Sequence, residues 1–106
     1  MDRAVYRTIK NYKEILESMG VGVKRIILYG SYALGSPGED SDIDLVVISD
    51  DFEKLDLWER LTLLGRAAAM LRKPIEALGY TEEEFASSEK GSFLADEVKT
   101  KGVEVV

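Results

Sequence analysis

Residues 30–47, GSYALGSPGEDSDIDLVV, constrain the fold more than any other stretch, because they join two predicted strands through a short polar loop. The strand before the loop, residues 23–29, is rich in β-branched side chains. The strand after it, residues 43–49, is a nearly continuous apolar run, which is typical of strands that are buried on both faces. The stretch also holds three serines and four carboxylates. Since like charges repel, the crowding of these acids requires a physical reason.

The rest of the chain alternates helical and extended patterns. Apolar spacing and capping signals predict helices at 3–19 and from Asp56 to the residues before Pro74, strands at 75–79 and 103–106, a short helical turn at 81–84 and a last helix at 89–101. This order predicts an α/β or α+β fold, with a small mixed sheet covered by helices. At this length we expect one domain over residues 1–106.

Composition excludes several kinds of chemistry. The chain has neither histidine nor cysteine, so it lacks the commonest general base, thiolate metal sites and disulfides. Oxygen ligands favour hard cations such as Mg²⁺ or Mn²⁺. The net charge of −6 and the scattered cations argue against a long nucleic acid as partner. No apolar run suits a membrane span or a signal peptide, so we expect no membrane partner and a cytoplasmic location.

Three acids form the candidate catalytic and metal-binding set. Asp42 and Asp44 stand two apart at the entry of a strand, so both side chains point to the same face, with α-carbons roughly 7 Å apart. A divalent cation between them would remove their repulsion. If the strand at 75–79 lies beside the second strand, Glu76 completes a three-carboxylate cluster. Such a cluster can hold two Mg²⁺ ions about 4 Å apart, as in many phosphoryl-transfer enzymes. The alternatives are a solvated acidic loop and an acid exposed on an edge strand.

Gly30 and Ser31 form the candidate phosphate cradle. Glycine lets a ligand approach the backbone, and a helical turn that begins at Ser31 would present N–H groups to a phosphate. An ordinary turn with a helix cap is the alternative. The cradle and the acids meet if the first two strands run antiparallel. A Walker loop is excluded because no lysine follows Gly35. A calcium-binding EF-hand is excluded because its glycine position holds Leu45.

The pattern Gly30-Ser31, Gly35 and Ser41-Asp42-Ile43-Asp44-Leu45 resembles the nucleotidyltransferase superfamily that includes polymerase β. The whole chain is similar to the minimal nucleotidyltransferases of prokaryotes. The resemblance implies the polymerase β-like fold, with two metal ions on Asp42 and Asp44 and with Glu76 as the third acid. It also implies a nucleoside triphosphate, expected to be ATP, held by Gly30, Ser31 and Ser41.

The resemblance extends to a partner. Small relatives are commonly encoded beside a helical protein of the HEPN class, in toxin–antitoxin pairs whose transferase adds AMP to a partner tyrosine. We therefore expect such a partner, in a homo- or hetero-oligomer. One departure is that Tyr32 and Leu34 stand where relatives often have arginine. This leaves open a second reading, a binding module that neutralises the partner with weak or no catalysis. Transfer to a small cationic acceptor such as an aminoglycoside is a third.

Overall fold

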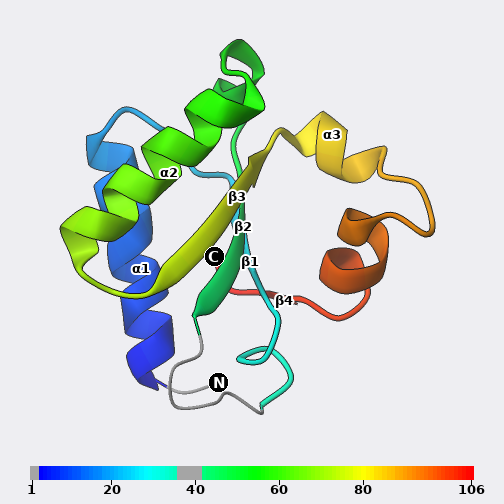
Figure 1. Cartoon of the computed structure of the whole chain (residues 1–106), viewed down its shortest axis with the longest axis horizontal. Helices are drawn as coiled ribbons and strands as arrows, with labels where there is room; N and C mark the ends of the chain where they lie inside the picture. The colour runs from blue at the N-terminus through cyan, green and yellow to red at the C-terminus, as the bar shows by residue number, and fades with distance from the viewer. Residues whose placement is uncertain (1–2, 36–41) are drawn as a thin grey trace.

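The computed structural model describes residues 3–35 and 42–106 (Figure 1). The elements in chain order are α1 (Arg3–Ser18), β1 (Arg25–Tyr29), β2 (Ile43–Ile48), the 3₁₀ turn η1 (Asp50–Lys54), α2 (Leu57–Leu71), β3 (Ile75–Tyr80), α3 (Glu82–Ala86), the π-helical η2 (Leu94–Lys99) and β4 (Val103–Glu104). None of the helices in these two ranges has the length and apolar composition that a membrane span requires.

The four strands form one mixed sheet in the order β3-β2-β1-β4. β1 runs antiparallel to both β2 and β4, whereas β2 and β3 are parallel and are joined by the crossover through α2. The antiparallel β1–β2 pair and the position of β3 beside β2 were the two conditions for bringing the predicted site together, and both are confirmed. The predicted mixed α/β architecture is confirmed as well.

α1 and α2 cover one face of the sheet, on the left in Figure 1. Their apolar side chains pack against alternate strand residues, including Ile26, Leu45 and Val47, which are 0% exposed. The hydroxyl of Tyr12 in α1 donates a 2.8 Å hydrogen bond to the carbonyl of Leu64 in α2. This bond ties the two helices to each other beneath the sheet.

The C-terminal part of the chain covers only part of the opposite face. Phe85 of α3 and Val98 of η2 pack against Ile27, Val46 and Ile48. Residues 44, 46 and 48 point to this same face, because successive side chains of a strand alternate between its two faces. Asp44 therefore lies on this face, beyond the end of the apolar cluster. The acids therefore stand where the C-terminal cover stops.

The local signals at helix starts are confirmed. Asp56 caps α2 and Thr81 caps α3, each in a capping box with a glutamate three residues on. The prediction of one helix over 89–101 is wrong in extent, because Gly91 has a positive φ of 94° and helical structure is confined to Leu94–Lys99. The last strand is also shorter than predicted, although Val105 and Val106 still hydrogen-bond to Ile26.

Candidate functional site

Gly30 forms the corner at which β1 ends. Its φ is +75°, a left-handed conformation that glycine adopts without strain. The N–H groups of Ala33 and Leu34 then donate to the Gly30 carbonyl at 3.1 and 3.2 Å, so one helical turn begins at Ser31. The predicted short turn after the strand is confirmed, and Ser31 lies half-buried in it.

The same glycine brings the backbone against the acids. A Cβ placed on Gly30 would run into a carboxylate oxygen of Asp44 and lie 3.2 Å from that residue's Cγ. Only a residue without a side chain lets the Asp44 carboxyl occupy this space. The glycine-serine turn and Asp44 therefore share one corner of the sheet.

Asp44 and Glu76 are direct neighbours across the parallel β2–β3 pair. Burial raises the pKa of Asp44, and the negative charges of Glu76 and Asp42 raise it further, together with a hydrogen bond between the Asp44 and Glu76 carboxyl groups. Glu76 is exposed, as is Asp42, which lies just outside the strand. Over residues 3–35 and 42–106 no three acids converge as a complete ligand set, so the predicted cluster is a contacting pair with Asp42 nearby.

The donor atoms at this corner fit a hard divalent cation. They are carboxylate oxygens on side chains that repel one another, and a cation would relieve that repulsion. The absence of a side chain on Gly30 leaves the room that the Asp44 carboxylate occupies. Mg²⁺ is therefore compatible with the residues present.

The structure describes only some of the loop residues that the sequence singles out. Ser41 lies outside the described residues, as does Asp40. Tyr32 packs partly buried against the core that α1 and α2 form, and Leu34 is 65% exposed. Neither residue brings a positive charge to the turn.

Tyr29 was not singled out from the sequence, although it adjoins the acids. It is the direct partner of Asp44 across the β1–β2 pair. Burial raises the pKa of Tyr29 to about 12, and the charges of Asp44 and Glu76 contribute. Its ring meets that of Phe93 edge-on, with centroids 5.4 Å apart. The one signal in the sequence for this position beside the acids was that Tyr29 is the last residue of β1.

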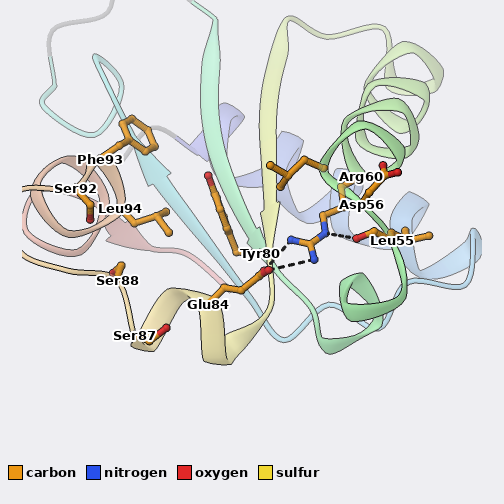
Figure 2. A pocket seen from close by; sticks show the side chains of 11 residues that line it. Leu55, Asp56, Arg60, Tyr80, Glu84, Ser87, Ser88, Ser92, Phe93 and Leu94 are labelled. Atoms are coloured by element: carbon orange, nitrogen blue, oxygen red, sulfur yellow. Dashed lines mark hydrogen bonds and ion pairs between the residues drawn. The ribbon is translucent and has the colours of Figure 1, made fainter.

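Farther along β3 lies an open cavity of about 760 Å³, between the start of α2 and the C-terminal segment (Figure 2). Arg60, only 5% exposed, donates 3.0, 3.0 and 3.2 Å bonds to the carbonyls of Phe52, Leu55 and Gly79. It also forms a 2.7 Å ion pair with Glu84. This cavity could not be read from the sequence, because its walls come from segments far apart in the chain.

Comparison with known proteins identifies the family. A family model described as "Nucleotidyltransferase domain" matches residues 9–103. A Methanocaldococcus jannaschii protein named "Putative protein adenylyltransferase MJ0604" is 43% identical over 60 residues, which is 54% of this chain and 60% of that protein. The chain thus matches less than two thirds of that relative's length.

Solved structures agree on the fold. A toxin–antitoxin complex with AMP-PNP contains a chain that superposes with a TM-score of 0.65 at 25% identity, over 95% of this chain and 72% of the other. A second is the complex of a tri-AMPylated Shewanella oneidensis HEPN toxin with its MNT antitoxin, with a TM-score of 0.54 at 22% identity over 93% and 71%. The expected polymerase β-like fold is therefore confirmed, and the chain belongs to the nucleotidyltransferase domain family.

Proposed function

We propose that this protein transfers AMP from ATP to a tyrosine hydroxyl of a HEPN-type partner protein and so acts as its antitoxin. The observation that carries the proposal is the shared corner of the sheet. There the glycine-serine turn lies against Asp44, and Asp44 contacts Glu76. A triphosphate held at the turn would have its α-phosphate beside the acids.

Each residue has a distinct part in this reaction. Gly30 and Ser31 bind the triphosphate, and the family resemblance adds Ser41 to this set. Asp42, Asp44 and Glu76 would hold Mg²⁺, which when bound stabilises the negative charge of the phosphates. Glu76 orients the acceptor hydroxyl and accepts its proton. The hydroxyl oxygen bonds to the α-phosphorus, the bond to the bridging oxygen breaks, and pyrophosphate leaves.

The relatives support the choice of nucleotide and acceptor. One is named as a protein adenylyltransferase, one complex contains AMP-PNP, and one contains an AMPylated HEPN toxin.

Reaction of the purified protein with ATP, Mg²⁺ and the protein encoded by the adjacent gene tests this proposal. We expect label to reach the partner from ATP labelled on the α-phosphate and not from ATP labelled on the γ-phosphate. The Asp44→Asn variant should transfer none. Absence of α-label transfer to a folded, toxic partner would refute the proposal.

A second candidate function is neutralisation of the partner by binding alone. It is favoured by Tyr32 and Leu34, since neither offers a cation to the triphosphate. The same experiment separates the two functions when partner toxicity is also scored. If Asp44→Asn neutralises the partner as well as the wild type does, binding alone is sufficient.

A further inference from the structure

The cavity beside Tyr80 has mainly apolar walls (Figure 2). Leu57, the first residue of α2, lines the cavity together with Leu55. Phe93 and Leu94 line it on the side of the C-terminal segment, and Tyr80 lies between the two sides. Leu57 is 63% exposed and Phe93 is 43% exposed. Exposed apolar residues gathered around one hollow are typical of a surface that another molecule covers.

Most polar side chains that line the cavity form hydrogen bonds within the chain. Arg60 is bonded to three carbonyls and to Glu84, as Figure 2 shows in part. The hydroxyls of Ser87 and Ser88, which follow α3, each donate a 2.8 Å hydrogen bond to a carbonyl of that helix. A ligand in the cavity would therefore contact chiefly apolar side chains. The hydrogen bonds around Arg60 hold the surrounding backbone in place.

Phe93 connects the cavity with the neighbourhood of the candidate active site. Phe93 lines the cavity and meets the ring of Tyr29, which stands opposite Asp44. Tyr80 and Glu76 belong to the same strand and point to the same face, four residues apart. At the usual rise along a strand this separation is roughly 13 Å. An extended segment of about four residues could thus link the two places.

Charge further restricts the occupant. The charged residues that line the cavity are Asp56, Arg60 and Glu84. Arg60 is buried and pairs with Glu84, so the lining keeps the one negative charge of Asp56, whose carboxylate also caps α2 by accepting the N–H of Glu59. A partner segment with a basic residue beside its apolar side chain would complement this surface.

We propose that this cavity is the acceptor-binding groove of the transferase. It takes an extended segment of the acceptor protein, with an apolar or aromatic anchor about four residues from the hydroxyl that is modified. A basic neighbour of the anchor faces Asp56. This inference rests on the proposed function, since that function supplies the acceptor.

Steady-state kinetics with Leu57→Arg tests the groove. The variant should raise the KM for the HEPN-type acceptor by about tenfold, because it removes an apolar contact and adds a like charge. The kcat at saturating acceptor and the KM for ATP should stay at wild-type values. Leu57→Ala should act in the same direction without adding charge. Met70→Arg is the matched control, because Met70 is 59% exposed on the same helix outside the groove.

Other outcomes would contradict the proposal that this cavity binds the acceptor. An unchanged acceptor KM in Leu57→Arg excludes it, and a rise in the KM for ATP alone assigns the cavity to the nucleotide. Self-association that Leu57→Arg abolishes, with acceptor KM unchanged, assigns it to a second copy of this chain. Calorimetric binding of the acceptor without ATP separates the two proposals. If the wild type binds but transfers nothing, and Leu57→Arg weakens binding, the proposed function fails while the groove stands.

Discussion

At the scale of single residues, Gly30 is the position where fold and function meet. Gly30→Ala forces alanine into a left-handed conformation, at a cost of roughly 1–2 kcal/mol. It also pushes the Asp44 carboxyl out of its place. We expect lower stability and loss of nucleotide binding, measured by urea unfolding and by ATP titration. Gly35→Ala is the matched control, since Gly35 has φ +74° but open space around it. Equal loss of ATP binding in both variants would contradict this account.

The pKa of Asp44 reports the proximity of the acids. Burial and the charges of Glu76 and Asp42 hold it above its usual value. Glu76→Gln removes one of those charges, so the pKa of Asp44 should fall in a carboxyl-detected NMR titration without metal. A raised pKa means that the Asp44 carboxyl binds a proton more tightly in the folded chain than in the unfolded one. Protonated Asp44 therefore contributes fully to stability below a pH of about 3.9, the usual pKa of an aspartate. That contribution is lost as the pH rises through the raised pKa. An unchanged Asp44 pKa in the variant would contradict the contact.

At the scale of elements, α1 and α2 are joined by one buried hydrogen bond. Tyr12→Phe removes the donor to the Leu64 carbonyl, which keeps its helical hydrogen bond because Leu64 lies inside α2. We therefore expect the loss of one ordinary hydrogen bond, about 0.5–1.5 kcal/mol in the free energy of unfolding, measured with urea. Tyr6→Phe is the control on the same helix, because Tyr6 is 44% exposed. A loss as large in Tyr6→Phe would mean that the bond contributes nothing specific.

The elements differ in how far the sequence predicts them. α2 was predictable at both ends, because Asp56 and Glu59 signal its start locally and Pro74 excludes its continuation. The extent of the C-terminal helix was harder to predict than that of α2. Gly91 interrupts the helix through its positive φ, and Val98 and Leu94 of the following η2 pack against the sheet, a tertiary contact that local spacing does not encode. Local signals thus mark helix starts better than they mark geometry set by tertiary contacts.

At the scale of the whole molecule, the site arises from strand order. Asp44 could be singled out from its spacing to Asp42, whereas the place of Glu76 depended on β3 lying parallel beside β2. Tyr29 and the groove escaped prediction, because they depend on the C-terminal segment folding back over one face of the sheet. One half of the sheet face then holds the acids and the other half holds an apolar groove.

The most direct test of this account is the rate of AMP transfer to the HEPN-type partner by wild type, Glu76→Gln and Glu53→Gln. Glu53 is exposed in η1 and serves as the control. We predict that Glu76→Gln lowers the rate by about 10²–10⁴-fold, the usual contribution of a positioned proton acceptor, with Glu53→Gln at the wild-type rate. Transfer by Glu76→Gln at the wild-type rate would contradict the placement of the reaction at the corner of Gly30, Asp44 and Glu76.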